Sequence, residues 1–435
     1  MAQINIPRKA IHTHEGAPAK HINAEMMLRR SVMSCLLWER EFYEDGESIT
    51  SRIAGLVPKV KAEAVAEIAA ECREKMKLRH MTLFIVREMA RHATHKHLVS
   101  ATLARIIQRA DELSEFVALY WKNGKRPLSA QVKKGLASAF TKFSEYDLAK
   151  YNRDGSVKLR DVLFLSHAKP KDEMQGLLWK RLIAGELATP DTWEVSLSSG
   201  ADKKTAWERL LAEKKLGALA MLRNLRNMQS ANVEQSAIVT ALQSVKTDRV
   251  LPFRFIAAAR YAPHLEPYLE EAMLRCLDGQ EKIPGKTVLM VDVSGSMDWK
   301  LSDKSDMVRM DAACGLAVLV RELCEQVEVW SFSERLVAVP LRRGFALRDA
   351  ITNSQGHGGT YLGGALSSLP SAYDRMIVIT DEQSHDRVPD PKGLGYMINV
   401  ASAANGVGYG PWLHIDGWSE SVIDYIRAVE QSKEG

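Results

Sequence analysis

The apolar pattern of the chain changes at Ile283-Pro284-Gly285, and this change restricts the possible folds more than any other feature of the sequence. From about residue 22 to residue 277, apolar side chains recur with the 3.6-residue period of an amphipathic helix. After residue 285, short runs rich in β-branched residues alternate with helical segments. The sequence therefore predicts an all-helical part followed by an α/β part.

The helical part is typical of stacked, antiparallel helix pairs. Its helical segments are joined by short breaks at prolines, such as Pro58, Pro127 and Pro263, and at polar turns. Stacked pairs bury a continuous core between neighbours and leave long surfaces for a partner. We predict about ten helices of roughly 12 to 20 residues within residues 21–283, after an N-terminal tail at 1–20.

The α/β part is typical of an open, mostly parallel sheet. Strands that are buried on both faces have almost wholly apolar runs, and the helices between them make right-handed crossovers. Two segments, 311–325 and 419–430, have a helical period. We therefore predict a doubly wound α/β domain over residues 284–435. Its predicted strands lie at 287–293, 327–332, 336–341, 375–380, 396–400 and 412–415.

Oxygen-bearing side chains follow two of the predicted strands. Asp292, Ser294 and Ser296 come at the end of the first strand, Thr360 precedes a helix, and Asp381 follows another buried strand. Ligands of open α/β sheets bind outside the carboxyl ends of the strands. Two carboxylates and three hydroxyls suit a hard divalent cation such as Mg²⁺, which keeps some of its waters. A strand followed by Asp-Ser-Gly is also a common turn, so the prediction depends on the downstream Thr and Asp.

These five residues resemble the metal-ion-dependent adhesion site of von Willebrand factor A domains, whose pattern is D-x-S-x-S, then T, then D. The resemblance implies that the hydroxyls of Ser294, Ser296 and Thr360 bind the metal directly. It implies that Asp292 and Asp381 act largely through coordinated water and hold the serines in place. One position on the ion then stays open to a partner carboxylate or to water.

Charge divides at the same place as the apolar pattern. Residues 1–285 carry 45 Lys and Arg against 34 Asp and Glu, a balance of about +11, whereas residues 286–435 carry 14 against 20, a balance of −6. Lys and Arg gain affinity for polyanions because they displace counterions condensed on phosphates. The asymmetry favours a polyanionic partner for the helical part, although a solvated basic surface gives the same count.

Four segments of the helical part resemble the TROVE module of Ro autoantigens and their bacterial relatives: YNRDG at 151–155, RDVLFLSHAKP at 160–170, MLRNL at 221–225 and LPFRF at 251–255. Together with the A domain, the resemblance to a bacterial or phage Ro-like protein covers the chain from about residue 20 onward. It implies HEAT-like repeats bent into a ring with a basic central hole, which the A domain closes. It also implies that small noncoding Y RNAs bind the outer surface and that single-stranded RNA ends enter the hole.

The resemblance assigns RNA contacts to Lys150, Arg153 and His167. Lys and Arg neutralise phosphates, and His stacks on a base or donates a hydrogen bond to a phosphate. The alternative is that Lys150 and Arg153 are solvated and that His167 caps a helix. Arg223 and Asn224 match a family signature too, although an Asn within a helix often holds a neighbouring backbone group.

The run RHATHKH at 91–97 has three alternative interpretations. Imidazoles at positions i, i+3 and i+5 cannot all face one way on a helix, which disfavours a structural metal site. A basic turn that faces RNA and a plain surface turn both remain open. Aromatic residues are few in the helical part and are mostly spaced as core residues, so a strip of aromatics for base stacking is not supported.

The features together predict an RNA-binding protein and not an enzyme, because no nucleophile elbow, phosphate loop or histidine–carboxylate set accompanies the metal motif. We expect a monomeric ring with Mg²⁺ that acts in RNA quality control or as an adaptor for an exoribonuclease and binds the 3′ ends of single-stranded RNA. A metal-dependent protein-binding module without RNA is the alternative. Tyr361 stands where Ro-like A domains are expected to have an acidic residue, which alters what approaches the ion.

The sequence also predicts a cytoplasmic location. No apolar run approaches the roughly 20 residues that a membrane-spanning helix needs, and the first residues lack the apolar core of a signal peptide.

Overall fold

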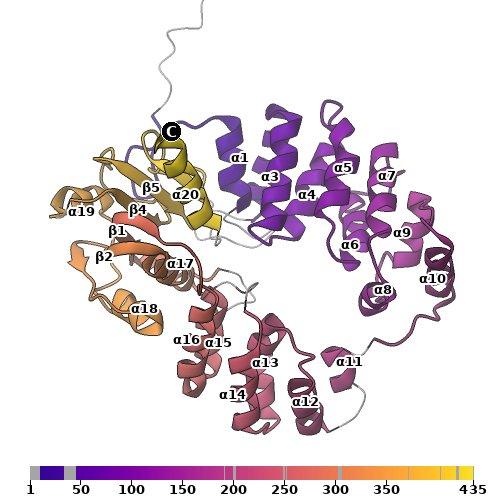
Figure 1. Ribbon diagram of the computed structural model, residues 1–435. Helices are drawn as coiled ribbons and strands as arrows, with labels where there is room; N and C mark the ends of the chain where they lie inside the picture. The colour runs from indigo at the N-terminus through magenta and orange to yellow at the C-terminus, as the bar shows by residue number, and fades with distance from the viewer. Residues whose placement is uncertain are drawn as a thin grey trace, which may run out of the picture.

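The structure is a computed structural model that describes residues 10–33, 46–190, 192–198, 202–247, 250, 252–301, 306–370, 372–401, 403–417 and 421–434. Its elements follow one another around a ring, with the helices along the top, right and bottom and the sheet on the left (Figure 1). This arrangement confirms the predicted order of a helical-repeat part followed by a doubly wound α/β part. No helix among the described residues has both the length and the apolar composition that a membrane crossing requires.

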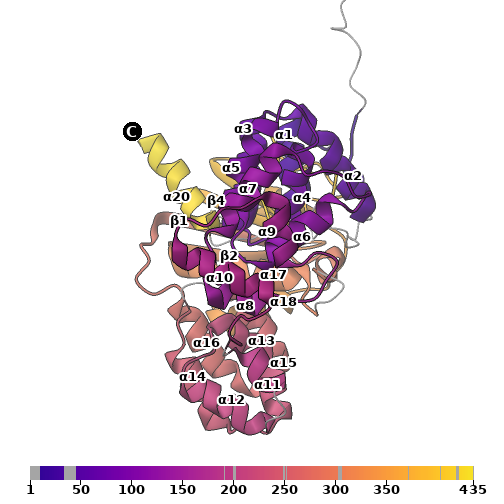
Figure 2. The same cartoon turned by 90° about the vertical axis from the view of Figure 1, so that its right-hand side faces the viewer.

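The first ten α-helices form one stack, which lies above α11 to α16 in the side view (Figure 2). Their apolar side chains share a single core that runs from Leu28 to Leu182. The helices are α1 (Ala24–Met33), α2 (Gly46–Leu56), α3 (Ala62–Glu74), α4 (His80–Met89), α5 (Lys96–Ile106), α6 (Asp111–Tyr120), α7 (Ala130–Phe140), α8 (Glu145–Tyr151), α9 (Leu159–Ser166) and α10 (Glu173–Ala184), with the 3₁₀ turn η2 (Val57–Lys59).

The next helices belong to the same core as the sheet. Trp207, Leu225, Phe255 and Met273 pack in one apolar cluster with Val291 of the first strand. These helices are α11 (Trp193–Ser198), α12 (Lys203–Ala212), α13 (Ala218–Ser230), α14 (Gln235–Ser244), α15 (Pro252–Tyr261) and α16 (Glu266–Arg275), with the 3₁₀ turn η3 (Pro263–Leu265).

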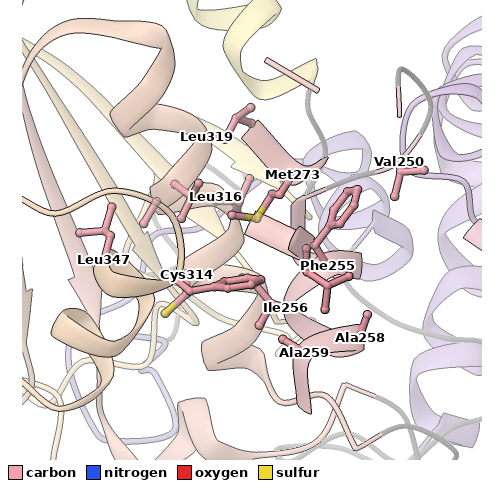
Figure 3. Packing of buried hydrophobic residues seen from close by; sticks show 14 of the residues in the cluster. Val250, Phe255, Ile256, Ala258, Ala259, Met273, Cys314, Leu316, Leu319 and Leu347 are labelled. Carbon is pink, nitrogen blue, oxygen red and sulfur yellow. The ribbon is translucent and has the colours of Figure 1, made fainter. Parts of the chain in front are cut away.

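Two helices of this second group, α15 and α16, pack closely against the α/β part. Figure 3 shows Phe255 and Ile256 of α15 and Met273 of α16 beside Leu316 and Leu319 of α17 (Arg309–Leu323). Gly315 permits the approach of the two helices, because a Cβ atom there would lie 2.9 Å from the Cβ of Phe253. The domain boundary predicted between residues 283 and 284 stays a prediction: the secondary structure changes there, whereas the apolar core continues.

The prediction of about ten long helices was wrong. The described part of the helical region contains sixteen α-helices, the shortest of 6 residues and the longest of 13. Polar caps begin two of these helices. Ser129 accepts a hydrogen bond from the Val132 N–H and begins α7, and Ser144 forms a capping box with Asp147 and begins α8.

The α/β part is a six-stranded sheet with the strand order β3-β2-β1-β4-β5-β6. All neighbouring pairs are parallel except β2 and β3. The helix predicted at 311–325 ends early, because Cys324 already starts a strand. The strands are β1 (Ile283–Asp292), β2 (Cys324–Phe332), β3 (Leu336–Ala338), β4 (Arg375–Thr380), β5 (Leu394–Asn399) and β6 (Leu413–Asp416).

Helices cover both faces of the sheet, as the doubly wound prediction requires. Leu289 and Val291 of β1 pack in the cluster that includes α17 and residues of α20 (Ser421–Glu434). Val288 and Met290 point to the opposite face and pack with Leu362 of α19 (Leu362–Ser368). α18 (Gly344–Thr352) packs beside α17. Because strands β2 and β4 flank β1, the strand order reverses at β1 and β4, where such sheets bind ligands.

Candidate functional site

The five predicted metal ligands lie at this reversal point. Asp292 is the last residue of β1, and Ser294 and Ser296 follow in the loop that leads into the 3₁₀ turn η4 (Gly295–Asp298). Asp381 follows the last residue of β4, and Thr360 lies two residues before α19. Because β1 and β4 are parallel neighbours, their carboxyl ends place the two aspartates at the same edge of the sheet.

Hydrogen bonds connect most of these side chains directly. The Ser296 hydroxyl donates to Asp381 Oδ2 at 2.5 Å, and the hydroxyl oxygens of Ser294 and Ser296 lie 3.3 Å apart. The Ser294 N–H donates to Asp292 Oδ1 at 2.9 Å, and the Thr380 hydroxyl donates to Asp292 Oδ2 at 2.6 Å. The structure thus brings the predicted Asp and Ser ligands of the two strands into one cluster.

The electrostatics of the cluster favour a cation. Burial raises the pKa of Asp292, and the nearby charge of Asp381 raises it further, to about 7. Arg309 partly compensates, because its Nη1 lies 3.8 Å from Asp381 Oδ2 and the side chain is almost fully buried. A divalent cation would relieve the repulsion between the two carboxylates.

The donor set fits a hard cation that binds through oxygen. Thr360 is 3% exposed, and its hydroxyl makes no hydrogen bond to any described residue, so it is available as a ligand. Within the described ranges, no group of three or more His, Cys, Asp or Glu side chains is arranged around a possible metal. The candidate centre therefore relies on two carboxylates supplemented by hydroxyls, the combination that its sequence motif predicts.

An aromatic pair lies beside Thr360. The rings of Tyr361 and His385 stack with their centroids 4.9 Å apart, and Tyr361 is 41% exposed. The ring nitrogen Nδ1 of His385 lies 3.2 Å from the Thr360 backbone nitrogen. The backbone N–H of His385 donates to the Thr360 carbonyl at 2.8 Å. Tyr361, which stands where an acidic residue was expected, is therefore a solvent-facing aromatic residue next to a predicted metal ligand.

The loop that follows Asp381 holds the N-terminal segment. The Thr13 hydroxyl donates to the Ser384 carbonyl at 2.8 Å, and the His14 N–H donates to Gln383 Oε1 at 2.8 Å. Ala17 is fully buried in the core on the α19 side of the sheet. The described end of the predicted tail, residues 10–20, thus packs against the α/β part.

A buried ionic cluster, named the clasp here, joins α1 to the α/β part and consists of Arg30, Glu382, His414 and Asp416. Arg30 forms an ion pair with Glu382, and both side chains are completely buried. His414 Nε2 lies 2.6 Å from Glu382 Oε1, and His414 Nδ1 lies 3.4 Å from Asp416 Oδ2. Sequence reasoning missed the clasp, because these charged residues belong to no motif.

The clasp is charged at neutral pH. Burial alone raises the pKa of Glu382, but the charges of His414 and Arg30 outweigh burial and lower the pKa to about 2. Burial alone lowers the pKa of His414, but the carboxylates of Asp416 and Glu382 outweigh burial and raise the pKa to about 9. The ring of elements is therefore closed by a mutually compensated set of buried charges.

The predicted RNA contacts lie on and after α8 and α9. The Lys150 ammonium lies 5.8 Å from the ring centre of Tyr146 and 5.7 Å from that of Tyr151. Arg153 is exposed in the loop after α8. No hydrogen bond or ion pair of the described residues joins Lys150 or Arg153 to His167, so the structure does not connect the three side chains directly.

His167 ends α9 through its backbone. It has φ 54° and ψ 39°, the left-handed conformation of a helix C-cap. Its main chain therefore caps α9, as the alternative interpretation of the sequence predicted. Its imidazole remains exposed and lies 3.4 Å from the ammonium of Lys133. The cap and an RNA contact are therefore compatible.

The two other sequence candidates are partly structural. His95 is 2% exposed, and its ring nitrogens lie 2.9 Å from the Thr94 hydroxyl and 3.0 Å from the Val60 carbonyl, so it stabilises the 91–97 turn. Asn224 donates to the Ala220 carbonyl at 2.8 Å, as expected of an Asn that holds neighbouring backbone. Arg223 is exposed and free of any ion pair among the described residues.

Comparisons with known proteins agree with the sequence resemblance. Residues 176–281 match the TROVE domain family. Telomerase protein component 1 of Mus musculus is 36% identical over 100 residues, and that of Rattus norvegicus is 34% identical over 100 residues. Each match covers 21% of this chain and only 4% of the relative.

The fold comparison extends over most of the chain. The crystal structure of the Ro (RSR) protein of Deinococcus radiodurans matches with a TM-score of 0.61, covering 93% of this chain and 100% of that one, at 16% sequence identity. At this identity the likeness concerns the fold. Residues 176–281 thus match the TROVE domain, and over 93% of its length the chain has a fold like that of this Ro protein, so it is Ro-like in fold.

Proposed function

We propose that this chain is an RNA-binding protein that holds small, Y-like noncoding RNA on the outer surface of its helical part and single-stranded RNA 3′ ends within the ring. The TROVE match and the Ro fold support RNA binding in general. The finer assignment rests on the charge of the helical part, about +11 over residues 1–285. An RNA quality-control role, with an exoribonuclease as partner, is part of the same proposal.

The observation that carries the proposal is that several cations of this basic part have no carboxylate partner. Lys133, Lys169 and Lys180 lie near His167 and form no ion pair with a carboxylate among the described residues. Arg223 and Arg254 are also exposed and form no ion pair with a carboxylate among the described residues. Cations without local partners keep their full attraction for phosphates.

We expect the double variant Lys150→Ala/Arg153→Ala to bind structured noncoding RNA more weakly. Two phosphate contacts would be lost, so the slope of log K against log salt should become shallower by up to about two units. His167→Ser should add a loss that depends less on salt, because stacking releases few counterions. Fluorescence anisotropy titrations at four salt concentrations measure both effects.

A matched control is Arg105→Ala/Arg209→Ala, which also removes two positive charges from the helical part. Arg105 is paired with Glu67 and Glu74, and Arg209 is paired with Glu213, so neither side chain offers an unpaired charge to RNA. This control should keep the wild-type slope. If the folded Lys150 and Arg153 variant and His167→Ser both bind with wild-type affinity and slope, the RNA assignment at these positions is wrong.

We further propose that Mg²⁺ binds at Asp292, Ser294, Ser296, Thr360 and Asp381. When bound, the ion supplies an open coordination position that can accept an oxygen of a partner. The residues of the chain hold it through hydroxyls, while Arg309 lies against Asp381 and limits the negative charge of the site. The proposal includes no catalytic step.

Asp292→Ala, and separately Ser294→Ala/Ser296→Ala, should abolish the thermal stabilisation that Mg²⁺ gives the wild-type protein. That stabilisation should reach about 2.7 kcal/mol when Mg²⁺ is at a hundred times its Kd. RNA affinity should stay near the wild-type value, because the ligands lie in the acidic part of the chain. Thermal melts with and without Mg²⁺ measure the first effect, and Asp390→Ala, a 63% exposed carboxylate of the α/β part, is the control.

The alternative function, a protein-binding module that uses the metal and no RNA, is favoured by one observation: exposed Tyr361 lies next to Thr360. The same variants separate the two. Unchanged Mg²⁺ stabilisation in the ligand variants would refute the metal site. A large loss of RNA affinity in folded ligand variants would instead place RNA at the metal face.

A further inference from the structure

A hollow of about 470 Å³ lies between the end of α9 and the outer side of α10. The loop between the two helices forms one wall, because left-handed His167 turns the chain away from α9 and Asp172 caps the start of α10. The hollow has the volume of ordinary small-ligand sites, which span about 300–1,000 Å³. It lies on the surface to which the predicted RNA contact His167 belongs, and neither the sequence nor the comparisons assign it a role.

The walls of the hollow are apolar and partly aromatic. Phe164 is 59% exposed and Ile183 is 37% exposed, although large apolar side chains of a helical stack are normally buried. Trp179 lies in the wall and is 4% exposed. The exposed Phe164 ring therefore offers a flat molecule a surface for stacking.

A donor in the wall lacks an acceptor. The indole N–H of Trp179 is buried and has no hydrogen-bond partner among the described residues. Buried donors in native proteins are nearly always paired, so an unpaired one needs a reason. Protein atoms cover this nitrogen, so an acceptor brought into the hollow would pair with it only if the indole turned outward.

Cations line the mouth of the hollow. Lys169 and Lys180 contribute to its lining together with His167, and Lys133 lies 3.4 Å from the His167 ring. Within the part of the chain that the structure describes, these three lysines form no ion pair with a carboxylate. The occupant should therefore carry negative charge outside the hollow and a flat, apolar group with hydrogen-bond acceptors inside it.

We propose that the hollow between α9 and α10 receives one unpaired nucleobase of the bound RNA, with the base against Phe164 and the flanking phosphates on Lys169 and Lys180. A nucleobase is flat, has acceptors for the Trp179 N–H and is attached to phosphates. Unpaired bases, unlike paired ones, can leave the stack and lie against aromatic side chains. An apolar side chain of a partner protein would leave both the N–H and the lysines without partners. This inference rests on the proposed RNA-binding function.

The test uses two RNA hairpins that differ by one unpaired nucleotide in the stem, which is 2-aminopurine in the first hairpin and absent from the second. The wild-type protein should bind the first hairpin more tightly by about fivefold to about a hundredfold, the range for stacking one base. Its 2-aminopurine fluorescence should change on binding. Phe164→Ala should remove both the preference and the fluorescence change but keep the salt slope, and Phe164→Tyr should restore them.

Met174→Ala is the matched control, because Met174 is also an apolar residue on this surface, is 77% exposed and does not line the hollow. It should behave like the wild-type protein. Equal wild-type binding of both hairpins, or an unchanged preference in folded Phe164→Ala, overturns the base-binding inference while RNA binding itself stands. Failure of the wild-type protein to bind either hairpin would instead overturn the proposed function.

Discussion

Arg30→Met should destabilise the protein by about 3–5 kcal/mol, the usual cost of removing one member of a buried ion pair. The variant leaves the Glu382 carboxylate completely buried without one of its two charged partners, although His414 remains 2.6 Å away. The Arg30 guanidinium also donates to the Asn405 carbonyl at 3.0 Å and lies 5.7 Å from the centre of the Tyr409 ring, and both contacts disappear. Thermal unfolding measures the loss as a lower Tm.

The neighbouring residue provides the control for this prediction. Arg29 is partly exposed and pairs with Glu71 of α3, which belongs to the same helical stack as α1. Arg29→Met should therefore cost only about 0–1 kcal/mol, as exposed ion pairs do. A Tm of Arg30→Met that equals that of Arg29→Met would show that the clasp does not stabilise the closed arrangement.

A double variant separates the ion pair from the packing of Arg30. In Arg30→Met/Glu382→Gln the carboxylate of residue 382 is gone and Asp416 keeps His414 as its partner at 3.4 Å, so the double variant should be more stable than Arg30→Met alone. Limited proteolysis of the segment before α1 gives a local readout, because residues 13–17 lie on the loop that carries Glu382. Faster cleavage in Arg30→Met than in Arg29→Met is the expected result.

That the proposed metal ligands lie close together could be predicted from the sequence, whereas the clasp could not. Asp292 and Asp381 follow buried strands, and the rule that parallel strands place their carboxyl ends together brings these residues to one edge. Arg30 and Glu382 are 352 positions apart and lie on an ordinary helix and in an ordinary loop. Only the closure of the chain around the ring brings them together, and no local pattern encodes that closure.

The number of helices and the hollow show two further limits of what the apolar period of the sequence can predict. A 3.6-residue period reports which face of a helix is apolar but not where a Ser cap begins a new helix, as Ser129 and Ser144 do. Phe164 lies off the buried face of α9, which consists of Leu159, Val162, Leu163 and Ser166, and it is 59% exposed where it borders the hollow. Aromatic spacing alone therefore understated the stacking surface that the helical part offers.

Structured RNA with a free single-stranded 3′ end should bind at least about tenfold more tightly than a blunt duplex of equal length. The helices α13 and α15 form the layer nearer the middle of the ring in Figure 1, and they carry the exposed residues Arg223, Arg226 and Arg254. Arg226 lies 6.0 Å from the ring centre of Tyr261, which is 40% exposed, so a base-stacking surface accompanies these charges. A single strand exposes its bases to such a surface, whereas a duplex about 20 Å across keeps them stacked and is too wide to follow it.

Competition assays at fixed salt decide between the two RNAs, and paired variants locate the cause of the preference. Arg223→Ala/Arg254→Ala should lower the affinity for the RNA with the free 3′ end and leave that for the blunt duplex nearly unchanged, because only the single strand reaches α13 and α15. By contrast, Lys150→Ala/Arg153→Ala should weaken both RNAs alike, since its contacts lie on α8 and the following loop. Equal wild-type affinity for the two RNAs would remove the reason to place RNA inside the ring, and a uniform loss in the Arg223 and Arg254 variant would make those arginines part of the outer RNA surface instead.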